Sequence, residues 1–327
     1  MTYGSGGRKR VLVTRRMPKR GMMMLEERFD VVCNPHDREL SHKEFLEMLR
    51  SVQPHALVSM LSDRVDDEAL SASADLKVVS NYAVGFNNID TKAASGRGIY
   101  ATNTPGVLTD ATADLAWALL MACSRRIAEG DRYVREGRFK SWAPMLLLGG
   151  DVAGRTIGIV GAGRIGQAVA RRAAGFGMKI LYWDVVKKAE MDALGAKSAE
   201  FETLVRESDF VTLHVPFTPE TKHLFGWREF CMMKQTAYFI NTARGACHDE
   251  AALVAALRDG KIAGAGLDVY ENEPALAKGL AELENVVLVP HIGSATTETR
   301  DKMAMMVAEN VIAALDGKRP PNAVNDI

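Results

Sequence analysis

Strand-like and helical segments alternate along almost the whole chain of 327 residues, in two successive series. Near the start, apolar runs such as RVLVT, HALVSML and LKVVSNYA are separated by helical patterns such as SHKEFLEMLRSV. Strands that alternate with helices of this length form a parallel sheet covered on both faces. After LLLGGDVAGR the alternation starts again, from TIGIVG to NVVLVPH. The pattern predicts two doubly wound α/β units, the second with about six strands.

Two helices stand apart from this alternation. The apolar run Leu115–Cys123 is too short to span a bilayer and predicts a helix that is buried on nearly all sides. The last helix has one apolar face that includes Asn310, and with no strand left to cover in the second unit it is expected to return to the first. We expect both helices to cross between the units and a ligand site to lie in the cleft between them, beside the carboxyl ends of strands. An apolar helix at such a crossing also favours a partner subunit.

Composition excludes several classes of function. Lys+Arg 41 against Asp+Glu 41 leaves no net charge, which argues against an electrostatic grip on nucleic acid. The first ten residues are polar with no apolar core behind them, so no signal peptide is expected, and no segment suits a membrane. The cysteines are scattered without a C-x-x-C pair, which predicts neither zinc nor disulfides and fits a cytoplasmic location: Cys33, Cys123, Cys231 and Cys247.

The glycine motif GAGRIG lies between an apolar strand and an amphipathic helix. In that context Gly161 permits a tight turn, Gly163 lets backbone approach a pyrophosphate, and Gly166 lets the helix pack close to the sheet. The next strand ends at Asp184, 18 residues after Gly166 (184 − 166), near the spacing of a carboxylate that binds a ribose. The motif predicts a dinucleotide site, and repulsion between Asp184 and a 2′-phosphate predicts NAD rather than NADP.

Three ionisable residues follow successive strands of the second series, namely Arg244, Glu273 and His291. The carboxyl ends of parallel strands share one edge, so the three can reach one cleft. An arginine there can hold a carboxylate by two parallel hydrogen bonds. A glutamate beside the histidine would favour the imidazolium and orient it, and the histidine would protonate a carbonyl as hydride arrives. Together they match what hydride transfer to a ketone with an acidic group requires.

These residues, with the motifs GAGRIG, VGFNNID, NTPGVLTDATADLAW, GLDVYENEP and PHIGSAT, resemble the D-isomer-specific 2-hydroxyacid dehydrogenases from about Lys9 onward, most closely the glyoxylate/hydroxypyruvate reductase branch. The resemblance implies a flavodoxin-like substrate domain (residues 1–105 and 296–327), an inserted Rossmann NAD-binding domain (residues 106–295) and a homodimer. It also implies reduction of glyoxylate or hydroxypyruvate to the D-2-hydroxy acid, with Arg244, Glu273 and His291 as the catalytic set.

The same resemblance implies further contacts. Those to the substrate are Leu61, Ser62, Val84, Gly85, Arg244 and Ser294. Those to the cofactor are Thr112, Gly161, Gly163, Arg164, Ile165, Gly166, Asp184, His214, Val215, Pro216, Thr242, Ala243, Asp268, His291 and Gly293. Among these, Asp268 is expected to face the nicotinamide amide. Trp142 resembles a position that reaches a neighbouring subunit's site.

One stretch departs from the family pattern. Where small apolar residues usually follow the ARG step, this chain has Cys247 and His248 before Asp249. His248 is therefore a rival for the role of the acid, although a place beside a helix cap favours a solvated or capping role.

Other activities within and outside the family stay open. D-3-phosphoglycerate dehydrogenase would call for basic residues near Ser62, where Arg64 is available, and phosphite dehydrogenase is a second alternative. A third is an NAD-sensing scaffold that resembles transcriptional corepressors of this fold, although their long tails are absent here. The choice of 2-hydroxy acid and the direction of flux are not determined by the sequence.

Overall fold

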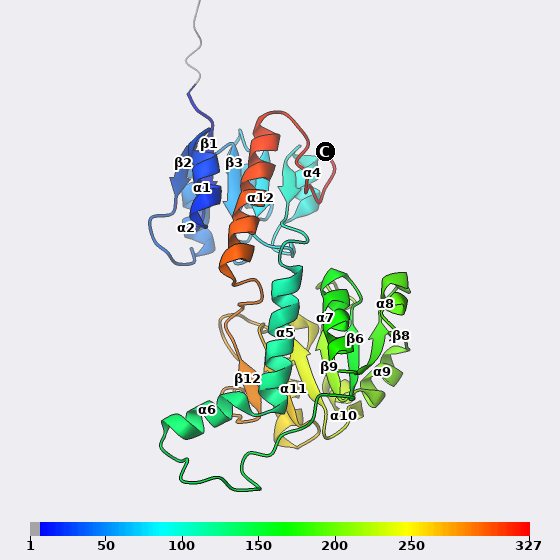
Figure 1. Cartoon of the computed structure of the whole chain (residues 1–327). Helices are drawn as coiled ribbons and strands as arrows, with labels where there is room; N and C mark the ends of the chain where they lie inside the picture. The colour runs from blue at the N-terminus through cyan, green and yellow to red at the C-terminus, as the bar shows by residue number, and fades with distance from the viewer. Residues whose placement is uncertain (1–6) are drawn as a thin grey trace, which may run out of the picture. The chain divides into compact units, whose positions relative to one another are not determined.

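The computed structural model describes residues 7–327, which divide into two units. The first comprises residues 7–108 and Ala295–Ile327, and the second comprises Thr109–Ser294. The polar stretch at the start of the chain lies partly outside the described residues, since residues 1–6 are not among them. Figure 1 labels many of the helices and strands of both units and colours the chain from its N-terminus to its C-terminus.

The first unit contains one parallel sheet with the strand order β2-β1-β3-β4-β5. This is the order of the flavodoxin-like doubly wound fold, so the predicted fold class is confirmed. Each strand coincides with an apolar run of the first series. Their bounds are β1 (Arg10–Val13), β2 (Asp30–Cys33), β3 (Ala56–Ser59), β4 (Val78–Asn81) and β5 (Tyr100–Thr102).

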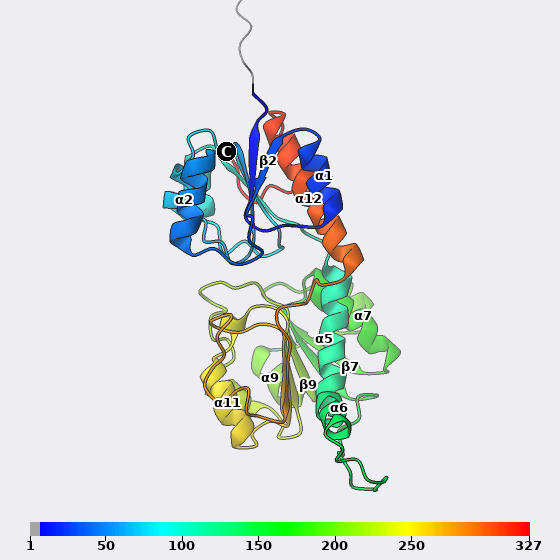
Figure 2. The same ribbon diagram turned by 90° about the vertical axis from the view of Figure 1, so that its left-hand side faces the viewer.

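Helices cover both faces of this sheet, as Figure 2 shows. On one face lie α1 (Lys19–Glu26) and α12 (Thr297–Leu315), and on the other lie α2 (His42–Val52), α3 (Asp67–Ser71) and α4 (Thr91–Gly96). The last helix thus returns to the first unit and packs on α1 and β4. Its approach to α1 is close, because a Cβ on Gly21 would lie 2.5 Å from the carbonyl oxygen of Ala304. Beyond α12, the amide of Val324 donates to the carbonyl of Ala101, the middle residue of β5.

The second unit contains a seven-stranded parallel sheet with the order β12-β11-β10-β9-β6-β7-β8. This is the order of a Rossmann fold. The strand beyond the six that the sequence predicted is the short β8 at the edge of the sheet. Its two residues are exposed, so no apolar pattern indicated it. The bounds are β6 (Thr156–Val160), β7 (Lys179–Trp183), β8 (Lys197–Ser198), β9 (Phe210–Leu213), β10 (Tyr238–Asn241), β11 (Gly264–Leu267) and β12 (Val286–Leu288).

The helices of the second unit flank its sheet. On one face, α5 (Thr109–Ser124) packs against α7 (Arg164–Gly175) and strands β10 and β11. Figure 2 shows α11 on the opposite face. The remaining helices are α6 (Ile127–Arg135), α8 (Ala189–Ala193), α9 (Phe201–Glu207), α10 (Trp227–Met232), the 3-10 turn η1 (Gly245–Cys247) and α11 (Glu250–Arg258).

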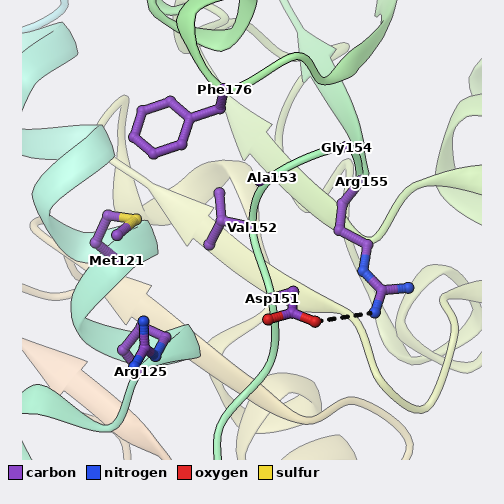
Figure 3. A pocket seen from close by; sticks show the side chains of 8 residues that line it. All are labelled: Met121, Arg125, Asp151, Val152, Ala153, Gly154, Arg155 and Phe176. Carbon is purple, nitrogen blue, oxygen red and sulfur yellow. Dashed lines mark ion pairs between the residues drawn. The ribbon is translucent and has the colours of Figure 1, made fainter.

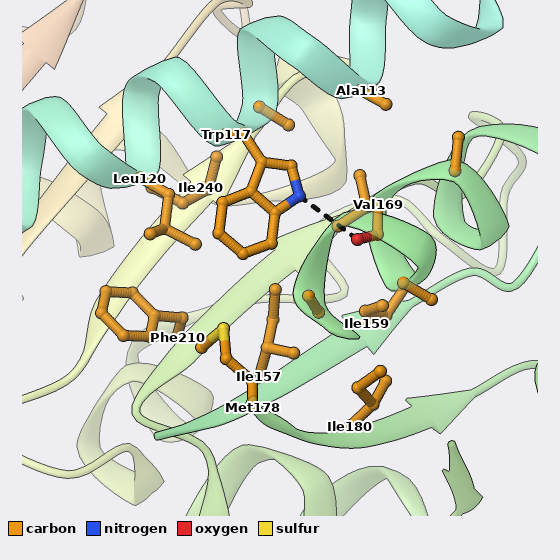
Figure 4. Close-up of a cluster of buried hydrophobic side chains, with 14 of the residues drawn as sticks. Ala113, Trp117, Leu120, Ile157, Ile159, Val169, Met178, Ile180, Phe210 and Ile240 are labelled. Atoms are coloured by element: carbon orange, nitrogen blue, oxygen red, sulfur yellow. Dashed lines mark hydrogen bonds between the residues drawn. The ribbon is translucent and has the colours of Figure 1, made fainter. Parts of the chain in front are cut away.

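The core between α5, α7 and the sheet explains why the run Leu115–Cys123 is so apolar. Trp117 lies in this core, stacks on Phe176 with ring centroids 4.7 Å apart, and donates its indole N–H to the carbonyl of Val169 (3.2 Å; Figure 4). A buried indole keeps its polar tip satisfied in this way. Within residues 7–327, none of the helices combines the length and apolar character needed to cross a membrane.

Candidate active site

Three turns at the carboxyl edge of the second unit's sheet carry the predicted ionisable residues. Arg244 follows β10, Glu273 follows β11 and His291 follows β12, and these strands are neighbours in the sheet. Nδ1 of His291 lies 2.8 Å from Oε2 of Glu273. Their side chains are 31% and 37% exposed, so a ligand can reach both. The structure thus brings a histidine and a carboxylate together in an accessible pair.

The charges at this edge influence one another. Burial raises the pKa of Glu273, but the hydrogen bond and the charge of His291 outweigh it, so that this pKa lies below its ordinary value. The second oxygen of Glu273 accepts the amide of Tyr270 at 3.0 Å. Burial lowers the pKa of Arg244, and the charge of Glu273 opposes this shift. Since an arginine pKa lies far above neutral, Arg244 keeps its charge beside an ionised Glu273.

The turn that carries His291 is held by Asp268. His291 has a left-handed backbone with φ 53°, a conformation that costs a non-glycine residue ~1–3 kcal/mol. Its amide donates to the carbonyl of Asp268 at 2.9 Å. The Asp268 carboxylate, only 1% exposed, accepts the amides of Ile292 (2.6 Å) and Gly293 (2.8 Å). Burial raises the pKa of Asp268, and these hydrogen bonds oppose the shift. Three hydrogen bonds thus fix the strained turn.

The turn that carries Arg244 is held by Asn241, which the sequence did not single out. Its amide oxygen accepts the N–H of Ala243 (2.9 Å), so its amide nitrogen donates to the carbonyl of Arg244 (2.9 Å). The same nitrogen lies 3.0 Å from Nδ1 of His248, which therefore acts as the acceptor. The side chain of Asn241 thus holds the turn by three hydrogen bonds.

His248 belongs to the interior of the second unit. The residue is 0% exposed and burial lowers its pKa to about 4, so it is neutral at neutral pH. The expectation of a solvated or capping histidine is wrong. The helix cap is Asp249, whose carboxylate accepts the amide of Ala252 at 2.9 Å. Arg244 therefore lies at the edge that carries the accessible pair, whereas His248 lies in the core.

The glycine turn after β6 is shaped by close backbone approaches. Gly161 has φ +97°, and a Cβ there would lie 2.7 Å from the carbonyl carbon of His214. A Cβ on Gly166 would lie 2.1 Å from the carbonyl oxygen of Gly161. Around Gly163, by contrast, a Cβ would meet nothing within 4 Å. Two glycines are required by packing, and the third leaves space in front of the amino end of α7.

These surroundings fit a dinucleotide. The amino end of α7, from Arg164 and Ile165, offers backbone N–H groups and a favourable dipole to phosphates. Asp184, at the end of β7, accepts the amide of Ala162 at 2.8 Å, which places its carboxylate beside the glycine turn. Buried Thr242 has a hydroxyl without a hydrogen-bond partner among the described residues, and such a group is a candidate for a ligand contact.

The remaining predicted cofactor residues lie around the same edge. His214, Val215 and Pro216 follow β9, and Thr242 and Ala243 follow β10. Burial of its imidazole lowers the pKa of His214 to about 3, and its Nδ1 also lacks a partner among the described residues. Thr112 of α5 comes near Gly293, since a Cβ on Gly293 would lie 3.5 Å from the Thr112 side chain.

The predicted substrate residues of the first unit lie in two loops tied together by asparagines. Asn88 donates to the carbonyls of Met60 and Asp63, at 3.0 Å each, and so frames Leu61 and Ser62. Asn81 donates to the carbonyl of Gly85 (2.9 Å) and to the amide oxygen of Asn88 (3.1 Å). Gly85 follows Val84, and Ser294 belongs to the other unit. The nearby Arg64 pairs with Asp66 at 2.9 Å.

Two hollows of the second unit lie away from these residues. One of about 480 Å³ is lined by the end of α5 and the segment before β6, where Asp151 and Arg155 form an ion pair at 4.0 Å (Figure 3). Another of about 360 Å³ borders Tyr238 and Glu129. Within residues 7–327, no group of three or more His, Cys, Asp or Glu side chains is arranged to hold a metal ion.

The segment from α6 to β6 exposes large apolar side chains. Trp142 is 80% exposed and Met145 is 76% exposed. Their neighbours along the segment are also exposed, namely Ile127, Val134, Phe139 and Leu148. Single exposed apolar residues are ordinary, but here six large apolar side chains are exposed along one segment of the chain.

Comparison with known proteins gives consistent matches. Residues 117–293 match the model described as "D-isomer specific 2-hydroxyacid dehydrogenase, NAD binding domain". A glyoxylate reductase of Korarchaeum cryptofilum is 53% identical over 319 residues, which are 97% of this chain and 96% of the relative. A solved structure from Thermus thermophilus has a TM-score of 0.91 at 45% identity, over 96% of this chain and 99% of that one. An NADPH-dependent glyoxylate/hydroxypyruvate reductase of Sinorhizobium meliloti, in complex with NADP and malonate, has a TM-score of 0.85 at 32% identity, over 97% of each chain.

Proposed function

The chain belongs to the D-isomer-specific 2-hydroxyacid dehydrogenase family, and from this premise we propose that it reduces glyoxylate or hydroxypyruvate to the corresponding 2-hydroxy acid. The observation that carries the proposal is the accessible pair of His291 and Glu273 at a sheet edge that also bears Arg244. The glyoxylate reductases among the relatives support the choice of substrate. The nicotinamide dinucleotide, when bound, supplies the hydride.

His291 is the acid in this proposal. Its Nδ1 faces the Glu273 carboxylate at 2.8 Å, so Nε2 is the atom that gives its proton to the carbonyl oxygen of the substrate. Glu273 orients the ring and stabilises the imidazolium, and its lowered pKa keeps it charged for that purpose. In the oxidative direction Nε2 takes the proton back.

Arg244 binds the substrate carboxylate. Its guanidinium presents two parallel N–H groups that a carboxylate accepts as a pair, which fixes the orientation of the carbonyl. We propose that Leu61, Ser62, Val84, Gly85 and Ser294 complete the substrate contacts. In the same proposal the first unit is the substrate domain, and the second is the NAD-binding domain.

We propose NAD as the preferred dinucleotide because of Asp184. Its carboxylate lies beside the glycine turn, where it would accept hydrogen bonds from ribose hydroxyls and repel a 2′-phosphate. The glycines and the neighbouring cofactor residues named above would hold the pyrophosphate and the nicotinamide. The Sinorhizobium relative is NADPH-dependent, so the preference needs its own measurement.

We propose a homodimer in which the exposed apolar segment around Trp142 is covered by a second copy. Burial of such side chains is favourable by ~25 cal/mol per Å² of apolar surface. Sedimentation equilibrium should give twice the chain mass of 35.7 kDa, and Trp142→Ala should shift the equilibrium toward the single chain. A wild-type protein that sediments as a single chain at micromolar concentration would contradict the proposal. A cytoplasmic location is part of the same proposal and is supported by four free cysteines.

The decisive experiment follows absorbance loss of NADH and of NADPH with glyoxylate, hydroxypyruvate, pyruvate and phosphohydroxypyruvate as separate substrates. The proposal expects the highest kcat/KM with NADH and one of the first two. Fast turnover of phosphohydroxypyruvate alone would favour the phosphoglycerate activity. Tight NADH binding without turnover of any of them would move weight to phosphite oxidation or to an NAD-sensing scaffold.

The preference for NADH is tested in the same assay. Asp184→Ser should raise the ratio of kcat/KM with NADPH to that with NADH. The control is Asp259→Ser, at the exposed residue that follows α11, which should leave the ratio unaltered. Equal or better activity of the wild-type protein with NADPH would overturn the NAD preference alone.

A further inference from the structure

Glu250 is a buried carboxylate that the proposed chemistry does not use. It is the first residue of α11 and is 2% exposed. Among residues 7–327 it forms no ion pair with a basic side chain. A buried charge without a counter-charge must be compensated by hydrogen bonds, and the position of those bonds indicates what the residue does.

Both oxygens of Glu250 bind backbone amides of one loop. The amide of Glu271 donates to Oε2 at 2.8 Å, and the amide of Ala277 donates to Oε1 at 2.6 Å. Glu273 lies between these two attachment points. The carboxylate thus clamps the loop on both sides of the residue that pairs with His291.

The same loop is also packed against the turn that carries Arg244. A Cβ on Gly245 would lie 1.9 Å from the carbonyl carbon of Tyr270 and 2.4 Å from the nitrogen of Glu271. The backbone of the Arg244 turn and the backbone of the clamped loop are therefore in direct contact. A shift of the loop would move Glu273 relative to both Arg244 and His291.

We propose that Glu250 is a positioning residue for the reaction. It holds the loop so that the Glu273 carboxylate stays in hydrogen-bond distance of Nδ1 of His291, and it acts through that loop without touching the substrate. The inference rests on the proposed roles of Glu273 and His291. It predicts that the reaction depends on a carboxylate of this length at position 250.

The test is Glu250→Gln, which keeps shape but replaces one accepting oxygen with an NH₂ group. In either orientation of the amide, one of the two backbone N–H groups loses its acceptor, so the loop is released at one side. With glyoxylate and NADH, we expect kcat to fall about tenfold, a part of the ~10²–10⁴-fold that acid–base catalysis contributes. The KM for NADH should stay unchanged, since the glycine turn is not affected.

Two readouts separate positioning from a merely structural role. The alkaline limb of the pH profile of kcat/KM should move to lower pH, because a displaced Glu273 favours the imidazolium less. Hydrogen exchange of the amides of Glu271 and Ala277 should become faster, a result that does not depend on activity. The matched control is Glu282→Gln, at a carboxylate with a side chain 74% exposed. It should leave kcat, the pH profile and the exchange of both amides unchanged.

The outcomes are distinct. A Glu250→Gln protein with a lower melting temperature but wild-type kcat and pH profile would overturn the inference. If that variant does not fold, Glu250→Asp is used in its place, since it keeps the charge but is one methylene too short to reach both amides. The same loss of kcat and shift of the profile is expected, and wild-type values again overturn the inference. A wild-type protein that reduces neither glyoxylate nor hydroxypyruvate would instead contradict the proposed function, and the exchange measurement would still report on the clamp.

Discussion

Two regions of the second unit are built on opposite principles. The turn after β6 depends on side chains that are absent, because Gly161 and Gly166 let backbone segments approach more closely than a Cβ permits. The turns after β10, β11 and β12 depend on side chains that are present, and buried polar groups such as Asn241 and Asp268 hold each turn in place. In the first region an added side-chain atom should disturb the turn, whereas in the second the loss of a polar group should do so.

The largest effect is expected from removal of the proton donor. His291→Gln keeps a polar side chain but has no group that can donate and take back the proton, so kcat should fall at least ~10²-fold. Binding of NADH, measured by fluorescence titration, should change far less than kcat. His248→Ala is the matched control, since buried His248 cannot act as the acid, and its turnover should stay close to wild type. Equal losses in both variants would show that the assignment of the acid is wrong.

An added methyl group tests the other region. Gly166→Ala forces a Cβ to within 2.1 Å of the carbonyl oxygen of Gly161, and such overpacking costs about 1–3 kcal/mol of stability. Gly163→Ala adds the same group where nothing lies within 4 Å, so the free energy of unfolding should hardly change. Both substitutions should weaken NADH binding. Urea unfolding and fluorescence titration of the two variants separate packing from binding, and equal stability of both would contradict the packing argument.

A smaller effect concerns pH and His248. Burial lowers its pKa to about 4 in the folded chain, below the ordinary value of a histidine, so the unfolded chain takes up the proton first as pH falls. The stability contribution is complete above pH 6.5 and is lost as pH falls toward 4, by ~2 kcal/mol at pH 5. His248→Val should therefore lose less stability between pH 8 and pH 5 than wild type. The measurement is urea unfolding at both pH values, with a substitution of exposed His36 as control. A pH dependence identical to wild type would contradict the buried, neutral state of His248.

The comparison also explains what the sequence could predict. Strands such as RVLVT and TIGIVG are buried on both faces, so their apolar runs stand out, whereas β8 has two exposed residues and no pattern. Glycines between a strand and a helix are equally readable, because few other residues can replace them there. The two parallel-sheet units could therefore be predicted from local sequence, and the structure confirms them.

The groups that support the turns of the proposed catalytic residues were less predictable. In the sequence, Glu250 looks like any acidic residue in the first turn of a helix. Asn241 likewise looks like any asparagine in a turn. Their roles arise from hydrogen bonds to residues up to 27 positions away, as between Glu250 and Ala277, and no local pattern encodes those partners. His248 was misread for the same reason, since a neighbouring capping aspartate says nothing about the core below it.

The return of α12 to the first unit has a consequence for how the chain is made. A ribosome releases all of residues 109–294 as one continuous stretch, and this unit can fold once that stretch has emerged. The earlier unit has its five strands by then, but the helix that covers α1 and β4 lies at Thr297–Leu315. At the ~5–20 residues per second of synthesis, the roughly 200 residues between Leu108 and Leu315 take ~10–40 s. During that interval the apolar surfaces of α1 and β4 that α12 covers in the folded chain have no helix over them.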